Sequence, residues 1–297
     1  MNLSIIIPTH NRKDNILNTL TCIARQVIQP QHKIEVIVVD HESTDGTTQV
    51  ILDREAYPYP FKLVRIPRKA WDAATPRNYG AKITNPDFDA IYFLDSDILL
   101  PPDRIQRLID DYLINPDPNR VIVGPYHNMS KPVNIENKDW YKETITDYTK
   151  DVRWKSFTEN EVSNDVAKGN QGFGYALACF GGSMMVNRSL FFRSGGYDET
   201  MINGGEDGDF GLTLWECGAV VSMDQGLLGW HQPHEIDVVR KATPFDTIAR
   251  IDAKHNVDVI KETGKNFRTW GIPWTMPQLE DAPKVDKTIG ELEGKEE

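Results

Sequence analysis

Long apolar runs are missing from this sequence of 297 residues. No stretch approaches the ~18 consecutive apolar residues that a membrane-spanning helix needs. The first apolar segment, Ile5–Ile7, is ended at once by Pro8, so we expect no secretory signal peptide. We expect a soluble, cytoplasmic protein that would serve any membrane process from the membrane surface.

Basic residues are in the minority. Lys and Arg total 33 against 44 Asp and Glu, which gives a formal net charge of −11. Because a surface of this net charge is poorly suited to neutralising a phosphate backbone, the composition argues against a general nucleic-acid-binding surface. A small anionic substrate would still bind if a local cation or a local basic cluster received it.

Cysteine is scarce as well. Cys22, Cys179 and Cys217 are odd in number and lack the spacing of metal ligands, so we expect buried thiols in a reducing compartment. The hydrophobic content of 39% and the charged content of 26% are ordinary for a soluble globular protein. The length suits one large α/β domain with elaborations, or two modest domains.

Short apolar segments alternate with amphipathic segments over the first hundred residues. Near-continuous Ile and Val runs separated by helices are typical of an α/β fold with a mostly parallel, Rossmann-like sheet covered on both faces. Ligands of such sheets bind beyond the carboxyl ends of the strands. We predict strands at Leu3–Ile7, Ile34–Val39, Phe61–Ile66 and Ile91–Leu94, and helices at Asn11–Val27, Thr44–Glu55 and Thr75–Thr84.

The alternation breaks off in the middle of the chain. Residues from Asn128 to about Gly169 are polar with scattered aromatic side chains, and we interpret them as an insertion over the sheet. Those aromatic rings suit sugar stacking, or they pack a helical lid onto the body. The other predicted elements are a helix at Arg104–Leu113, strands at Val121–Tyr126 and Ser183–Val186, a surface helix at Pro244–Thr263 and a frayed charged end at Lys284–Glu297.

Two aspartates follow the strand that ends at Leu94. In Asp95-Ser96-Asp97, the carboxylates of residues i and i+2 would share a face of an extended chain and could approach one ion together. Mg²⁺ and Mn²⁺ prefer oxygen ligands and leave positions open for phosphate oxygens. The alternative is a pair of solvated aspartates in a turn.

Asp40 and Arg77 are two further candidates at element ends. Asp40 ends its strand and could accept hydrogen bonds from a base or a ribose hydroxyl; alternatively, Asp40 or Ser43 starts the next turn or caps the next helix. Arg77 lies in the first turn of a predicted helix, where the helix N-terminus and the guanidinium both favour an anion. The alternative for Arg77 is a surface ion pair.

Glu206 and Asp207 follow Gly204-Gly205 at the start of a predicted helix that continues through Trp215. Acids at this position cap a helix; a carboxylate on a Gly-rich hinge can also act as a general base toward an acceptor hydroxyl. His231, in Gly229-Trp230-His231-Gln232, could complete a metal site as a nitrogen ligand, with His234 as a competitor, or it could be a structural residue.

Taken in order, these segments resemble the glycosyltransferase family 2 superfamily with the GT-A fold. The segment from Gly204 to His231 is similar to the carboxyl-terminal part shared with galactosyl- and N-acetylgalactosaminyl-transferases. Trp230-His231-Gln232 is similar to the metal-histidine segment of bacterial polysaccharide polymerases. The resemblance covers about Leu3 to His234, and its order is specific although each motif alone is not. The residues that carry it are Ile5–Arg12, Val38–Asp40 with Ser43–Thr47, Arg77-Asn78, Leu94–Asp97, Gly195–Glu199 and Gly205–Asp207.

The resemblance implies a role for each motif. Thr9 and Asp40 would hold the base and ribose, Asp95 would contact the ribose or the metal's water shell, and Asp97 would ligate Mn²⁺ or Mg²⁺ with His231. Asp207 would be the catalytic base, with Glu206 binding the acceptor. The implied nucleotide site comprises Pro8, Thr9, Asn11, Arg12, Asp40, Arg77, Asp95 and Ser96, and the implied sugar site comprises Gly181, Gly182, Gly205 and Trp230.

The resemblance also implies a domain plan. Residues 1–235 would form the GT-A domain, with a nucleotide-binding half at 1–126 and an acceptor-binding, catalytic half at 127–235. Residues 236–297 would form a helical extension and a charged tail. One position departs from the family: Thr213 stands where processive members carry an arginine, which argues against a processive enzyme.

The expected function is metal-dependent transfer of a sugar from a nucleotide-diphosphate sugar, UDP-linked in preference to GDP-linked, to a carbohydrate or glycoconjugate hydroxyl, with inversion. Three alternatives remain: a retaining transferase on the same fold, a sugar-phosphate nucleotidyltransferase and a non-catalytic binding protein. The nucleotidyltransferase would open with a Gly-rich basic loop, where this chain has Pro8-Thr9-His10-Asn11-Arg12.

Overall fold

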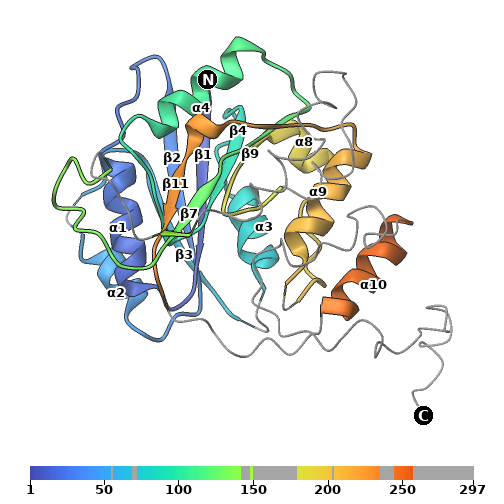
Figure 1. Ribbon diagram of the computed structural model, residues 1–297, viewed down its shortest axis with the longest axis horizontal. Coiled ribbons are helices and arrows are strands. Elements are labelled where there is room, and N and C mark those ends of the chain that lie inside the picture. The colour runs from blue at the N-terminus through green and yellow to red at the C-terminus, as the bar shows by residue number, and fades with distance from the viewer. Residues whose placement is uncertain are drawn as a thin grey trace.

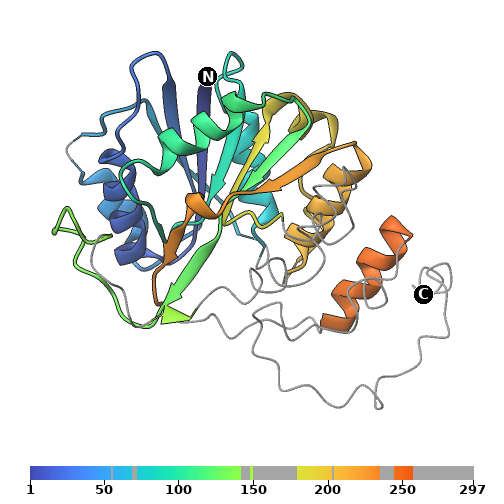
Figure 2. The same cartoon turned by 45° about the horizontal axis from the view of Figure 1, so that its top comes forward.

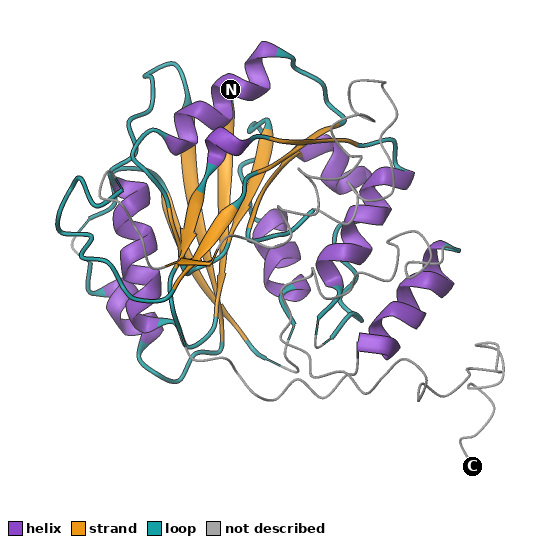
Figure 3. Ribbon diagram, in the orientation of Figure 1, coloured by secondary structure: helices purple, strands orange, loops and turns teal. Residues whose placement is uncertain are grey.

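The computed structural model describes residues 1–54, 56–68, 72–141, 148–149, 179–202, 204–234 and 244–256. A seven-stranded sheet with the order β10-β6-β9-β4-β1-β2-β3 forms its centre, and helices cover both faces (Figures 1 and 3). The strands are β1 (Asn2–Thr9), β2 (Lys33–His41), β3 (Phe61–Ile66), β4 (Ala90–Leu94), β6 (Arg120–Val123), β9 (Ser183–Asn187) and β10 (Val220–Met223). This confirms the predicted α/β fold with a mostly parallel sheet.

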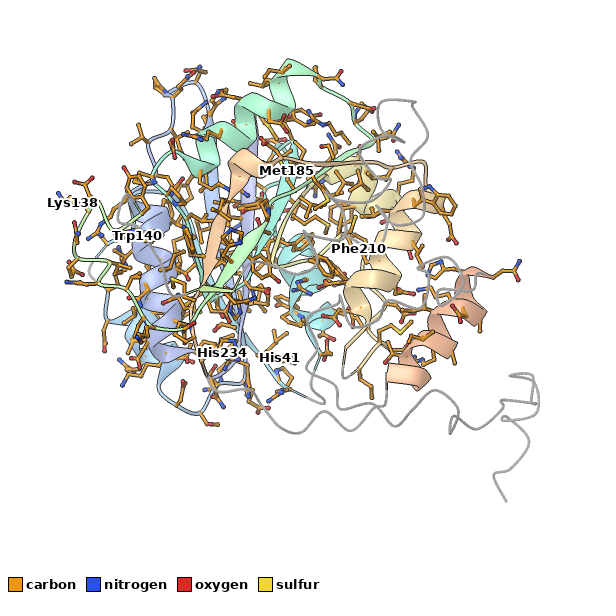
Figure 4. All side chains as sticks on the ribbon, in the orientation of Figure 1. His41, Lys138, Trp140, Met185, Phe210 and His234 are labelled. Atoms are coloured by element: carbon orange, nitrogen blue, oxygen red, sulfur yellow. The ribbon has the colours of Figure 1, made fainter. Side chains whose placement is uncertain are left out.

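Only β9 runs against its neighbours in this sheet. It pairs antiparallel with both β4 and β6, whereas the other neighbouring pairs, including β1 with β2 and β4, are parallel. The carboxyl ends of the parallel strands therefore meet at one edge, the lower edge in Figure 1. His41 and His234 lie at this lower edge in Figure 4.

Two apolar cores lie on opposite faces of the sheet. Leu3, Ile5 and Ile7 of β1 pack with α1 (Lys13–Ala24) and α4 (Arg104–Ile114), and α2 (Thr47–Leu52) contributes Ile51 to the same core. Ile6 points the other way, toward α3 (Ala74–Lys82), α8 (Arg188–Arg193) and α9 (Glu206–Glu216). Each fully buried Ile of this strand contributes about 1.5–3 kcal/mol through lost water contact.

Gly80 lets α3 lie directly on the sheet. A Cβ atom at this position would lie 2.5 Å from Ile6 Cγ2 and 3.3 Å from Val39 Cγ2. Because α3 also carries Arg77 and Asn78, this close approach sets how far those side chains reach over the sheet edge.

A second, four-stranded sheet was not predicted from the sequence. Its order is β5-β11-β7-β8, formed by Ile98–Leu99, Gly229–His231, Tyr126–Met129 and Tyr148–Thr149. The predicted strand Val121–Tyr126 is wrong as one element, because the chain leaves the first sheet after Val123 and enters the second at Tyr126. Gly124 and Pro125 make the break, and Pro125 offers no backbone N–H to a ladder.

Most other elements lie where the sequence predicts them, with shorter ends. The first two helices are Lys13–Ala24 and Thr47–Leu52, rather than Asn11–Val27 and Thr44–Glu55, and they begin later because residues 10–12 and 42–46 form connecting loops. The predicted Pro244–Thr263 helix is α10 (Pro244–His255), which ends before Asn256, a residue with φ of 50° that continues no right-handed helix.

The segment predicted to be an insertion is described only at its start and at β8. Asn128 and Met129 belong to β7, and Trp140 packs in a small core with Cys22 of α1 and Trp230 of β11. The rest of the segment to Gly169, and the predicted charged end Lys284–Glu297, lie outside the described residues. In the described part of the chain, no helix is both long and apolar enough to cross a membrane.

Candidate active site

The loops after β1 and β2 interlock at the carboxyl edge of the sheet. The Asn11 backbone N–H donates to Ser43 Oγ at 2.9 Å, and the Thr44 N–H donates to Asn11 Oδ1 at 2.8 Å. The Arg12 N–H donates to Thr47 Oγ1 at 3.0 Å. Asn11 itself adopts φ of 50°, a left-handed conformation that asparagine tolerates. These contacts make one fixed rim beside the ends of the two strands.

Thr9 and Asp40 are neighbours on β1 and β2 at this rim. Asp40 is fully buried; the Ser43 N–H donates to Asp40 Oδ1 at 2.9 Å, and the Thr48 hydroxyl donates to Asp40 Oδ2. Thr9 Oγ1 is buried without a hydrogen-bond partner. Asp40 therefore stabilises the turn that follows it, which was the alternative role predicted from the sequence. Its contact with a nucleotide stays a prediction.

The two aspartates after β4 point to different partners. The Ile98 N–H donates to the Asp95 carbonyl at 3.2 Å, which closes a turn over Asp95-Ser96-Asp97. The expectation of an extended chain is therefore wrong, because the backbone forms a turn here. Ser96 is buried, and its carbonyl oxygen accepts from Thr19 Oγ1 at 2.9 Å.

Arg77 gathers three carboxylates that are far apart in the sequence. Its Nη2 lies 3.0 Å from Asp95 Oδ1, and its Nη1 lies 3.1 Å from Asp207 Oδ1 and 3.4 Å from Glu206 Oε1. The arginine side chain is only 3% exposed. The position is thus a buried ion-pair centre rather than the surface ion pair of the alternative interpretation, and the predicted contact of Arg77 with a nucleotide stays a prediction.

One guanidinium facing three acids cannot balance their charge. Burial lowers the pKa of Arg77, but Asp207, Tyr197, Asp95 and Glu206 raise it well above its ordinary value. Burial and the neighbouring Asp207 raise the pKa of Glu206 to about 7 despite Arg77. The site therefore holds a cationic arginine, and Glu206 changes protonation near neutral pH.

Gly181 and Gly182 line the same cluster. The Gly181 N–H donates to Asp207 Oδ1 at 3.0 Å, and a Cβ at this residue would lie 2.6 Å from Arg77 Nε. A Cβ at Gly182 would lie 2.8 Å from Asp95 Oδ2. Both glycines thus let the backbone approach the carboxylates, and the Gly181 amide fixes one oxygen of Asp207.

Tyr197 and Asn78 contact Arg77 or its neighbouring backbone and so support the acid cluster. The sequence alone assigned neither residue a role. The Arg77 guanidinium lies over the Tyr197 ring, with Cζ 5.3 Å from the centroid. Asn78 exchanges hydrogen bonds with the Tyr197 backbone, at 2.8 Å to its carbonyl and 2.9 Å from its N–H. The Gly195–Glu199 motif contains Tyr197 and was the feature of the sequence that could have identified it.

Asp97 faces two histidines. His234 Nε2 lies 3.2 Å from Asp97 Oδ2, and His231 Nε2 lies 3.5 Å from Asp97 Oδ1. Arg12 Nε lies 3.6 Å from Oδ2. Burial raises the pKa of Asp97, but the hydrogen bond with His234 and the neighbouring His231, His234 and Arg12 bring it below its usual range. The distances do not rank His231 ahead of His234, although the sequence favoured His231.

The second sheet carries the histidines to Asp97. His231 pairs with Ile98, the residue after Asp97, in the antiparallel ladder of β11 and β5. The Gln232 N–H donates to the Asp97 carbonyl at 2.8 Å, and Asn18 Nδ2 of α1 donates to the side-chain oxygen Oε1 of the buried Gln232 at 2.8 Å. The Tyr126 ring stacks on His231 at 5.7 Å. The site thus depends on an element that the sequence did not reveal.

The donor set of these three residues fits a divalent cation. One ligand atom from each of Asp97, His231 and His234 lies within 4.8 Å of the others. Asp97 Oδ1 is buried and has no hydrogen-bond partner, so an oxygen lone pair is available to a metal. Imidazole nitrogens beside a carboxylate suit a first-row transition ion better than Mg²⁺.

Trp230 and Gly205 occupy structural positions. Trp230 is 9% exposed and packs in the core with Leu99 and Met129, so its indole is covered rather than presented to a ligand. Gly205 precedes Glu206 with φ of 93°, a conformation that favours glycine. Their predicted sugar contacts stay a prediction.

The family model described as glycosyl transferase family 2 matches residues 4–192. Chondroitin synthase of Escherichia coli is 26% identical over 250 residues, which are 77% of this chain and 34% of that protein. Validoxylamine A glucosyltransferase of Streptomyces hygroscopicus subsp. limoneus is 28% identical over 248 residues, 78% of this chain and 52% of that protein. The chain thus spans about half or less of the length of these relatives.

A solved structure shares the fold. The crystal structure of S. aureus TarS 1-349 in complex with UDP-GlcNAc has a TM-score of 0.64 at 16% identity, and the match covers 88% of this chain and 67% of that one. This agrees with the expected GT-A fold. The family match ends at residue 192, so the likeness of Gly204–His231 to galactosyl- and N-acetylgalactosaminyl-transferases stays a prediction.

Proposed function

This chain belongs to glycosyl transferase family 2, and we propose that it is a metal-dependent enzyme that transfers a sugar from a nucleoside-diphosphate sugar to an acceptor hydroxyl. UDP is the proposed nucleotide, which the UDP-GlcNAc complex of TarS supports by fold likeness. The acceptor is a carbohydrate or a glycoconjugate, as the names of the chondroitin synthase and glucosyltransferase relatives suggest.

One observation carries the proposal. Asp95, Glu206 and Asp207, from two parts of the chain, converge on the buried Arg77 at the carboxyl edge of the sheet. Asp97, which lies in the turn directly after Asp95, forms a second cluster with His231 and His234. A site with several carboxylates and a candidate cation position suits a reaction in which a hydroxyl loses a proton and a diphosphate leaves.

Asp207 is the proposed general base. Its Oδ1 accepts hydrogen bonds from Arg77 Nη1 and from the Gly181 N–H, and its side chain is 23% exposed. Two donors on one oxygen fix the carboxylate and leave its other oxygen for the acceptor hydroxyl. That oxygen takes the proton as the acceptor oxygen bonds to the anomeric carbon and the bond from that carbon to the diphosphate breaks.

Glu206 is the proposed acceptor ligand. With a pKa of about 7, its carboxyl group exists in both protonation states near neutral pH and can donate to or accept from a sugar hydroxyl. A single displacement of this kind inverts the configuration of the sugar, which is the stereochemical outcome we propose.

Asp97, His231 and His234 would hold the metal. A divalent cation bound there supplies positive charge to the diphosphate of the donor. We propose Mn²⁺ rather than Mg²⁺ because two of the three candidate ligands are imidazoles. The ribose and base would lie along the rim at Thr9, Asn11 and Asp40, where Thr9 Oγ1 has no protein partner.

The test separates chemistry from donor binding. Asp207→Asn preserves the shape of the side chain but removes the base, so transfer should be abolished while metal-dependent donor binding measured by calorimetry persists. Asp87→Asn, on the exposed loop before β4, is the matched control and should transfer normally. Normal turnover by Asp207→Asn would show that another group takes the proton.

A further inference from the structure

Helix α10 lies against α9, outside the acid cluster, and the two helices run side by side in Figures 1 and 2. Ile248 and Ile251 of α10 are buried. The first residues of α9 are Glu206 and Asp207, so whatever holds α9 also holds the two carboxylates of the site.

Asp209 is the point at which α10 holds α9. It lies two residues after Asp207 and its side chain is 1% exposed. Lys254 Nζ donates to Asp209 Oδ2 at 2.8 Å, and His255 Nε2 lies 3.0 Å from Asp209 Oδ1. Each oxygen of this buried carboxylate contacts a side chain of α10. Asp209 therefore cannot move without breaking a charged contact.

The same two side chains of α10 reach beyond Asp209. Lys254 Nζ also lies 3.0 Å from Asp198 Oδ2, and His255 Nδ1 lies 2.8 Å from Glu216 Oε1 near the end of α9. Thus α10 contacts α9 over two turns and also contacts the loop that carries Tyr197.

That loop leads back to the centre of the site. Tyr197 lies under Arg77, and its backbone exchanges two hydrogen bonds with Asn78, the residue after Arg77. Lys254 therefore joins two supports of the acid cluster, α9 through Asp209 and the Tyr197 loop through Asp198.

Thr247 provides a second, uncharged contact. A Cβ atom at Gly205 would clash with Thr247 Cγ2, so α10 covers the residue directly before Glu206. Gly205 has φ of 93°, and its carbonyl accepts the Asp209 N–H at 3.0 Å. The turn that presents Glu206 and Asp207 is thus enclosed by α10 on its outer side.

We propose that α10 is a positioning element of the transferase, in which Lys254, His255 and Thr247 hold α9 so that Asp207 faces the acceptor hydroxyl. This rests on the proposed role of Asp207 as the base. None of the three residues contacts the reacting atoms. They act through Asp209 and Gly205, so their loss should lower the rate of the chemical step and leave donor binding at the far rim unchanged.

The experiment compares Lys254→Met with Lys254→Arg in the full chain. Misplacing a catalytic group by about 1 Å costs up to about 100-fold in rate, so we expect kcat to fall by about 10- to 100-fold in Lys254→Met. UDP affinity should stay within about twofold, and Lys254→Arg should recover most of kcat. Ala253→Gln, on the exposed face of the same helix, is the matched control.

A second pair of variants guards against unfolding. Lys254→Met leaves Asp209 with a single partner, whereas the double variant Asp209→Asn/Lys254→Met removes both charges and leaves no unpaired buried ion. Thr247→Ser removes only the methyl group that covers Gly205 and keeps the hydroxyl. Both should fold and should lower kcat without a matching change in UDP affinity.

Hydrogen exchange tests the same contact without any substrate. Amides of the first turn of α9 should lose protection in Lys254→Met and keep it in Ala253→Gln. If the wild-type protein transfers no sugar, the proposed function fails, but this exchange comparison still decides whether α10 holds α9. Unchanged exchange, or a loss of kcat within twofold in all α10 variants, would overturn the positioning role.

Discussion

Replacing Arg77 by methionine tests whether one buried cation organises the acid cluster. Arg77 is 3% exposed and lies 3.0 Å from Asp95, 3.1 Å from Asp207 and 3.4 Å from Glu206. Methionine fills a similar volume without charge, so the change isolates the ion pairs from the packing.

The size of the stability loss in Arg77→Met follows from the carboxylates that lose their cationic partner. At an effective dielectric constant of about 20, each contact of about 4 Å or less is worth about 4 kcal/mol or more, but burial offsets much of this. Breaking a buried pair by removing one partner typically costs about 3–5 kcal/mol. We expect a loss of about 3–5 kcal/mol in the free energy of unfolding at about pH 8.

The loss should shrink as the pH falls. Burial raises the pKa values of Asp95 and Glu206 and Arg77 lowers them, so without the guanidinium both pKa values should rise further above their unfolded values. Groups shifted in this direction stabilise the fold at low pH, and that stability is lost as the pH rises through their folded pKa. One additional bound proton changes stability by about 1.4 kcal/mol per pH unit, so the loss at about pH 5 should be about 2 kcal/mol or more below that at pH 8.

The assay is urea unfolding at several pH values in a metal-chelating buffer, which keeps the Asp97 cluster in one state. Arg104→Met is the matched control, because Arg104 is equally buried but donates to the Leu227 carbonyl and to Ser183 Oγ. The control should cost stability without the added dependence on pH. A loss for Arg77→Met below about 1 kcal/mol, or one that does not vary with pH, would refute the reasoning.

Three further predictions concern single contacts. Gly181→Ala should lower transfer by about tenfold or more while the fold survives, because the added methyl displaces the guanidinium beside the base; kcat and a thermal melt check this, and unchanged kcat would contradict it. Burial lowers the pKa of His255, but its bonds to Asp209 and Glu216 raise it above its usual value. The stability that it adds is therefore present at about pH 6 and lost as the pH rises through the folded pKa, so wild type and His255→Gln should differ at about pH 6 and converge at about pH 9 in urea unfolding. His234→Ala should weaken Mn²⁺ binding by about tenfold or more in calorimetry, and unchanged affinity would show that His234 is not a ligand.

The main sheet was predictable because its first strands are continuous runs of apolar side chains. Leu3–Ile7 and Ile34–Val39 are continuous apolar runs, and both lie within observed strands. The second sheet was not predictable, because β5 and β8 have two residues and β11 has three. No periodicity is visible over such lengths, so their pairing depends on tertiary contacts alone.

The identity of the candidate site residues could be predicted from the sequence better than their contacts with one another. Asp97 and His231 were expected together, and the structure does bring them within 3.5 Å. The placement of Arg77 against Asp207 was not expected, because 130 residues separate them and an ion pair leaves no local sequence pattern. The different partners of Asp95 and Asp97 were also not predicted, since the chain turns where an extended strand was expected.

Binding of UDP with and without Mn²⁺ tests the central claim most directly. If Asp97 and the two histidines hold the cation that receives the diphosphate, calorimetry should show UDP binding to the wild-type protein with Mn²⁺, and a large loss of affinity when the metal is chelated. Asp207→Asn should bind like wild type, and Asp97→Asn should not bind. Equal affinity with and without metal, or normal metal-dependent binding by Asp97→Asn, would contradict the account.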